Sequence, residues 1–102
     1  MFALVVRFDL ADERAAERFD AISARLVEQI TADEPGTLLY ATHTVEGEPL
    51  SRLFYEVYAD QVAFQLHEDA PYIQAFLAAR EPLLAGCRVE RLTPTLAKGL
   101  PG

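Results

Sequence analysis

His67 is the side chain in this sequence best suited to proton transfer. It is one of two histidines, and it lies among Ala63, Phe64 and Leu66 in the stretch YEVYADQVAFQLHED. Histidine titrates near neutral pH, so an imidazole at this place could remove or deliver a proton. If Asp60 caps a helix, a turn of about 100° per residue puts His67 in the middle of an apolar stripe. His67 should therefore point at whatever this helix covers.

Glu56 is the acid that could hold this imidazole. In the strand that precedes the helix, Glu56 shares one face with Phe54 and Tyr58. A glutamate in the middle of a strand is costly to bury without a partner, so we predict that Glu56 faces the helices and pairs with His67. The carboxylate would orient the ring and leave its second nitrogen for a substrate hydroxyl. The alternative is that both residues are hydrogen-bonded parts of the core.

Aromatic residues surround this predicted pair. Tyr72 follows Pro71, where a break between two helical segments would open the backbone near a pocket mouth. Its phenol could donate a hydrogen bond to a substrate oxygen, or it could lie at the surface or at a dimer rim. Four further aromatic residues are candidates for pocket lining or, alternatively, for packing in the core: Phe54, Tyr58, Phe64 and Phe76.

The sequence gives no sign of a metal or cofactor site. Two histidines and the single Cys87 provide no metal-ligand spacing, and no glycine-rich phosphate loop is present. Cys87 is expected to be an inert buried thiol. We therefore expect no metal and no cofactor.

The length, composition and net charge of the chain exclude several classes of protein. The chain has 102 residues, which suits one domain, and 51% of them are hydrophobic and 25% charged. Its net charge of −7 disfavours binding to nucleic acid or to an anionic membrane surface. Arg7 interrupts the first apolar run, so neither a signal peptide nor a membrane span is expected. A single cysteine suits a reducing compartment, and we expect a cytoplasmic protein.

The elements follow the order β-α-β-β-α-β. Strands are predicted at residues 2–9, 37–45, 51–59 and 87–95 from runs of β-branched and aromatic residues. Apolar residues at helical spacing predict a helix that begins near Ala15, after a cap at Asp9 or Asp12, and ends before the sequence EPG. Asp60 begins a second helix that Pro71 interrupts.

This order predicts an α+β, ferredoxin-like fold with a four-stranded antiparallel sheet and helices on one face. The other face needs cover, and a second copy of the sheet would supply it, so we expect a homodimer joined sheet to sheet. The predicted domain spans residues 1–95. A tail at 96–102 is expected to be loose or to lie on a partner.

Three motifs, EPGTLLY, FYEVYADQVAFQLHED and APYIQAFL, resemble the antibiotic biosynthesis monooxygenase domain over about the whole chain. The resemblance implies a dimeric α+β barrel. It also implies chemistry in which an aromatic or polyketide-type substrate reacts with O₂ without metal, flavin or haem. Two departures matter. The chain has no tryptophan, and residues 72–76, where haem-cleaving members carry a histidine, hold none, so haem cleavage is disfavoured.

The expected function is a cofactor-independent monooxygenase that oxidises a small aromatic, quinol or polyketide-type substrate with O₂. His67 would be the base, Tyr72 a hydrogen-bond donor and Glu56 the orienting residue. Two alternatives stay open: an isomerase or cyclase that uses the same pocket without O₂, and a dimeric small-molecule-binding or accessory protein without turnover.

Overall fold

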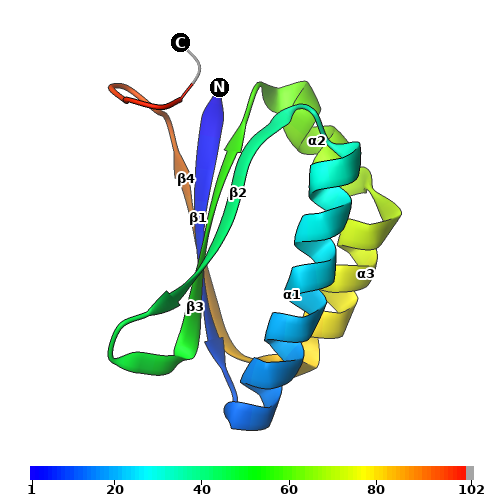
Figure 1. Ribbon diagram of the computed structural model, residues 1–102, viewed down its shortest axis with the longest axis vertical. Helices are drawn as coiled ribbons and strands as arrows, with labels where there is room; N and C mark the ends of the chain where they lie inside the picture. Colours follow the sequence, from blue (N-terminus) through cyan, green and yellow to red (C-terminus); the bar gives the residue numbers. More distant parts are fainter. Residues whose placement is uncertain (101–102) are drawn as a thin grey trace.

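The order of elements agrees with the sequence prediction, with the second helix divided in two. The computed structural model describes residues 1–100. Along the chain lie β1 (Phe2–Leu10), α1 (Glu13–Asp33), β2 (Thr37–Val45), β3 (Glu48–Tyr58), α2 (Gln61–Asp69), α3 (Pro71–Arg80), the 3-10 turn η1 (Glu81–Leu83) and β4 (Leu84–Leu92) (Figure 1).

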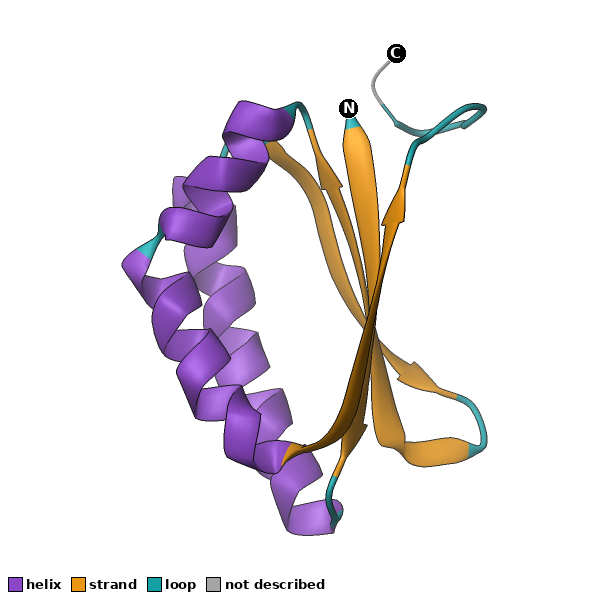
Figure 2. Ribbon diagram, turned by 180° about the vertical axis from the view of Figure 1, so that it is seen from behind, coloured by secondary structure: helices purple, strands orange, loops and turns teal. Residues whose placement is uncertain are grey.

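The four strands form one antiparallel sheet in the order β2-β3-β1-β4. All three helices cover the same face of this sheet, and no helix covers the opposite face within the described part of the chain (Figures 1 and 2). The predicted α+β, ferredoxin-like architecture is confirmed. The strand order places β1 and β3 in the centre, where the residues that face the helices become the most deeply buried.

Two aspartates begin the helices, and proline-containing segments end or divide them. Asp12 caps α1 by accepting a hydrogen bond from the backbone N–H of Ala15 at 2.8 Å. Asp60 caps α2 in the same way, with the N–H of Ala63 at 2.8 Å. Pro71 occupies the first turn of α3, where its missing N–H costs no helical hydrogen bond. The predicted break between the two helical segments is therefore confirmed.

The core lies between the sheet and the helices and is rich in aromatic rings. Phe19 of α1 is fully buried, and its ring centre lies 4.9 Å from that of Phe8, 5.7 Å from Phe54 and 6.0 Å from Phe76. These separations are typical of favourable aromatic pairs. The cluster joins α1, β1, β3 and α3, so it fixes the distance between the helices and the sheet.

The strands that differ most from the prediction are β3 and β4. β3 begins at Glu48 rather than at residue 51, because Gly47 adopts a positive φ of 76° and the turn needs only two residues. β4 runs from Leu84 to Leu92 rather than over 87–95, because its pairing with β1 extends to Leu10. Cys87 is exposed rather than buried, since β4 is an edge strand.

The proposed division into a domain at 1–95 and a tail at 96–102 remains a prediction, and residues 101–102 lie outside the described part of the chain. In residues 1–100, every helix is too short or too polar to cross a bilayer.

Candidate active site

A cavity of about 190 Å³ lies between the sheet and the two C-terminal helices. Apolar side chains of β1, α2, α3 and β4 form most of its wall. We call it the inner cavity, and its polar lining consists of Tyr40, Glu56, His67, Glu68, Arg80 and Arg91. The strand register explains part of this set, because Tyr40 pairs with Glu56, Glu56 with Leu4, and Leu4 with Arg91. One row across all four strands therefore contributes to the cavity.

His67 points at the sheet, as its helical phase predicts. Its side chain is 5% exposed, and its ring centre lies 5.2 Å from that of Tyr58 and 5.6 Å from that of Tyr40. Its Nδ1 atom lies 2.7 Å from Oε1 of Glu34. Its other ring nitrogen, Nε2, forms no hydrogen bond with residues 1–100, and the residue lines the inner cavity. The imidazole is thus held from one side only.

Glu34 holds His67, and sequence reasoning missed it. Its side chain is 8% exposed and accepts hydrogen bonds from Oγ1 of Thr37 at 2.6 Å, from the hydroxyl of Tyr72 and from Nδ1 of His67. A carboxylate only accepts hydrogen bonds, so Nδ1 of His67 carries a hydrogen, and in the neutral form of the ring Nε2 has a free lone pair. The one signal was the position of Glu34 in the motif EPG, which indicated only the end of a helix.

The predicted hydrogen bond between Glu56 and His67 is not formed. Glu56 does face the helices, and it is 5% exposed, but its Oε1 accepts the hydroxyl of Tyr58 at 2.5 Å. The reason is local: Tyr58 lies two residues along the same face of β3, and Glu34 already occupies Nδ1 of His67. Glu56 and His67 nevertheless line the same cavity.

Burial changes the acid–base properties of Glu56. Desolvation raises its pKa to about 7, with smaller contributions from the charges of Glu68 and Glu34, while the hydrogen bond from Tyr58 opposes the rise. Burial, together with the Glu56 charge, also raises the pKa of Tyr58. The cavity therefore contains a carboxyl group that changes protonation near neutral pH, beside an oriented imidazole.

Tyr72 lies outside the inner cavity. It lines a surface groove on the other side of Glu34, and it reaches the site only through its hydrogen bond to that carboxylate. Partial burial, followed by the bond to Glu34 and its charge, raises the pKa of the Tyr72 phenol. The hydroxyl of Tyr72 is directed toward Glu34 and not into the inner cavity, and its role as a hydrogen-bond donor to a substrate stays a prediction.

The four candidate lining aromatics divide into two pairs. Phe64 and Phe76 line the inner cavity, whereas Phe54 and Tyr58 do not. Phe54 and Tyr58 are almost fully buried on the central strand β3, and Phe54 borders a separate surface pocket between α1 and β2. For these two residues the arrangement favours the alternative of packing in the core over lining of the inner cavity.

Gly36 allows α2 to approach the loop that carries Glu34. A Cβ atom on Gly36 would lie 2.6 Å from Cβ of Ala63, closer than such atoms pack. The absence of a side chain at residue 36 therefore lets α2 bring His67 within hydrogen-bond reach of Glu34.

No group of three or more histidine, cysteine, aspartate or glutamate side chains in residues 1–100 is arranged to hold a metal ion.

Comparisons with known proteins identify a family. Residues 1–79 match the family model described as antibiotic biosynthesis monooxygenase. A crystal structure from Caulobacter crescentus, of a protein assigned to that group, is 26% identical, with a TM-score of 0.87 over 93% of this chain and 90% of that chain. A similarly assigned structure from Bacteroides thetaiotaomicron is 22% identical, with a TM-score of 0.87 over 99% of this chain and 94% of that chain, and shows the shared fold.

A curated relative is longer than this chain. It is an uncharacterized protein of Synechocystis sp., 35% identical over 69 residues, and the match covers 68% of this chain and 46% of the relative. The chain therefore spans about half the length of the curated relative it matches.

Proposed function

The chain belongs to the antibiotic biosynthesis monooxygenase family, and from this premise we propose that it is a cofactor-independent monooxygenase that oxidises a small monocyclic phenol or quinol with O₂. The observation that carries the proposal is His67, which lines a mostly apolar cavity while buried Glu34 holds its Nδ1. Such a partly enclosed, mostly apolar space with a few directed polar groups suits a small aromatic ligand.

The cavity volume supports a substrate with one ring. Benzene fits an apolar cavity of about 150 Å³. The inner cavity holds about 190 Å³, so a substituted single ring fills it. A fused three-ring substrate of the polyketide type would require the helices to move away from the sheet, which the Phe19 cluster resists.

In the proposed reaction His67 acts as the base, and Glu34 replaces Glu56 as its orienting residue. Nε2 of His67 removes the phenol proton, and the resulting phenolate passes an electron to O₂. The two radicals combine at a ring carbon to form a hydroperoxide, which loses water and leaves a quinone carbonyl. The substrate gains one oxygen atom and loses two hydrogen atoms, which is a four-electron oxidation. Those four electrons reduce O₂ to the new carbonyl oxygen and one water molecule.

Glu56 supplies the second proton transfer in this scheme. With a pKa of about 7 it is partly protonated at neutral pH, so it can donate a proton to the departing peroxide oxygen. The bond from Tyr58 holds one of its oxygens in place and leaves the other for the cavity.

A second candidate function rests on the same pair of groups. An imidazole and a carboxyl group of near-neutral pKa in one cavity can remove a proton from one atom of a substrate and return it to another. That arrangement favours an isomerase or cyclase, which would need no O₂.

Oxygen consumption separates these functions. Purified protein, dialysed against a metal chelator and free of flavin, is incubated with monocyclic phenols and quinols in an oxygen electrode cell. We expect one O₂ consumed and one isotopically labelled oxygen atom incorporated per product, with no hydrogen peroxide released. Conversion of substrate at the same rate under argon would instead establish the isomerase, and restoration of the rate only by added metal or flavin would contradict cofactor independence.

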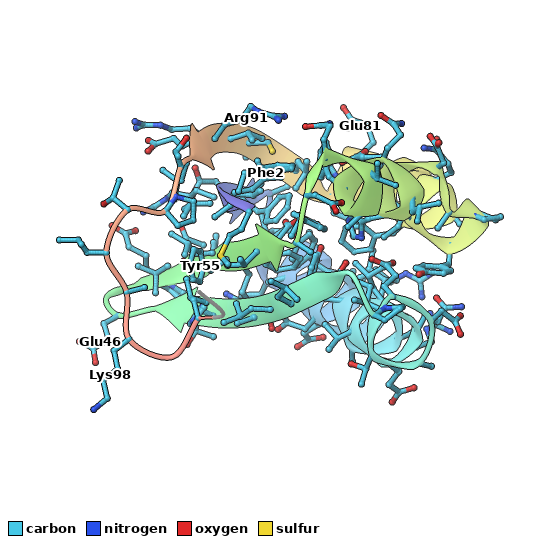
Figure 3. All side chains as sticks on the ribbon, turned by 90° about the horizontal axis from the view of Figure 1, so that it is seen from above. Phe2, Glu46, Tyr55, Glu81, Arg91 and Lys98 are labelled. Carbon is cyan, nitrogen blue, oxygen red and sulfur yellow. The ribbon has the colours of Figure 1, made fainter. Side chains whose placement is uncertain are left out.

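We further propose that the chain forms a homodimer through the face of the sheet that the helices leave open. Val5, Leu53 and Tyr55 are half-buried there, and Val5 and Tyr55 pair directly across β1 and β3. Figure 3 shows Tyr55 on the side of the sheet away from the helices. An apolar sheet face of this kind needs a partner. Sedimentation velocity should give a dimer for the native chain and a monomer for Tyr55→Asp; a native monomer at micromolar concentration would rule the dimer out.

A further inference from the structure

Arg80, the last residue of α3, brings a guanidinium group to the inner cavity without an acidic partner. Its Nε atom is buried and has no hydrogen-bond acceptor within residues 1–100. Its Cζ atom lies 5.4 Å from the ring centre of Phe8, and the ion pairs of the described chain do not include it. A buried donor without an acceptor is unfavourable and therefore uncommon in folded proteins. The terminal Nη groups of Arg80 also form no hydrogen bond within residues 1–100 and, unlike Nε, keep accessible surface, so they are free to donate to a ligand in the cavity.

Arg91 adds a second guanidinium at the exposed end of the same cavity. It belongs to the edge strand β4, and its Cζ atom lies 4.9 Å from the ring centre of Phe2 and 5.4 Å from that of Phe64. Figure 3 shows Arg91 beside Phe2. The aromatic faces fix the position of the cation, while its N–H groups stay available, since Arg91 also forms no ion pair within the described residues.

The two ends of the inner cavity differ in charge. Leu4 pairs with Glu56 on one side and with Arg91 on the other, so Glu56 and Arg91 are two strands, or roughly 10 Å, apart. Glu68 also lines the cavity, yet it forms no ion pair with either arginine. The lining thus holds two arginines and two glutamates, and neither arginine is neutralised by an ion pair with an acid of the described residues.

We propose that Arg80 binds a carboxylate on the substrate, so that the substrate is a monocyclic hydroxyaromatic acid. Arg91 lies over Phe2, toward the other end of β1 from the Phe8 ring beside Arg80, and adds a longer-range attraction for the same charge. The planar guanidinium of Arg80 matches the two oxygens of a carboxylate. The ring then extends away from the arginines, and its hydroxyl reaches His67 and Glu56, where a carboxylate would be repelled. The identity of the substrate rests on the proposed oxidation, whereas the carboxylate site does not.

Binding measurements test the site without turnover. Isothermal titration calorimetry with para-hydroxybenzoate and para-hydroxybenzamide compares two probes of nearly equal shape that differ in charge. We expect the native protein to prefer the acid by roughly 10–100-fold, the range of a hydrogen bond to a charged group. Arg80→Gln should remove the preference, and Arg91→Gln should reduce it in part. Arg14→Gln, which makes the same charge change on an exposed residue of α1, should leave it unchanged.

Equal affinities for the two probes in the native protein would overturn the carboxylate site, as would an undiminished preference in Arg80→Gln. If Arg80→Gln does not fold, Arg80→Lys keeps the charge but loses the planar fork and should show an intermediate preference. The proposed oxidation and the proposed carboxylate site can be contradicted independently of each other. Preferential binding of the acid without oxygen uptake would contradict only the oxidation, and oxygen uptake with neutral phenols alone would contradict only the carboxylate site.

Discussion

Replacing His67 with glutamine should lower kcat by about 10²–10⁴-fold, the usual contribution of a positioned general base. Glutamine is close in size and polar, and it can still bond to Glu34, but it cannot accept a proton from a phenol. Oxygen uptake at saturating substrate measures the effect. Urea denaturation of the same variant separates lost chemistry from lost folding. A folded variant that keeps most of its rate would show that His67 is a core residue and not the base.

Glu34→Gln tests how the imidazole is positioned. The amide still fits between Thr37 and Tyr72, but it can present an N–H to Nδ1 and so reverse the ring's hydrogen-bond pattern. We expect kcat to fall, by less than in His67→Gln, with little change in KM, because Glu34 does not line the inner cavity. His43→Gln is the matched control. His43 is exposed, and within residues 1–100 its side chain bonds only to the carbonyl of Leu53, so its replacement should leave both constants unchanged.

The stability of the protein should fall as pH rises through neutrality, because of Glu56. Its pKa is about 7 in the folded chain against 4.5 for an ordinary glutamate, so folding favours the neutral form. This contribution is complete below the unfolded value and is lost as pH rises through the folded one. Between pH 5 and pH 8 the linkage lowers the free energy of unfolding by about 2–3 kcal/mol.

Urea denaturation at these two pH values measures that loss. In Glu56→Gln the side chain is neutral at both, so the difference in stability should shrink by about 2–3 kcal/mol relative to the native protein. Glu46→Gln, an exposed replacement in the β2–β3 turn, should keep the native pH dependence. An unchanged pH dependence in Glu56→Gln would mean that Glu56 is ionised throughout this range.

The fold was predictable because its signals are local. The caps at Asp12 and Asp60, the break at Pro71 and the period of each element depend on neighbours within a few residues. The strand boundaries that differ most depend on pairing: β4 begins early because hydrogen bonds to β1 extend to Leu10. The alternation of apolar and polar residues within one strand does not show how far that strand pairs with its neighbour, so the start of β4 could not be found from the sequence.

The candidate site was predictable only in part, for the same reason. Helical phase and strand alternation gave the faces of His67 and Glu56 correctly, since both follow from local geometry. The partner of His67 lies 33 residues away along the chain, and the packing of α2 against the loop between α1 and β2 brings it near. The cavity and its arginines depend on four strands and two helices at once, which no pattern in one segment encodes.

The contact between Gly36 and Ala63 has a consequence for the range of substrates across chains of this architecture. With alanine or a larger residue in place of this glycine, α2 must move away from the start of β2. Because α2 contributes Phe64 and His67 to the inner cavity, the cavity becomes wider and the histidine moves away from its carboxylate. We therefore expect the size of the residue at position 36, which follows Pro35, to influence which substrates fit the inner cavity. This position is the first to compare between relatives that accept different substrates, and the first to redesign for a bulkier one.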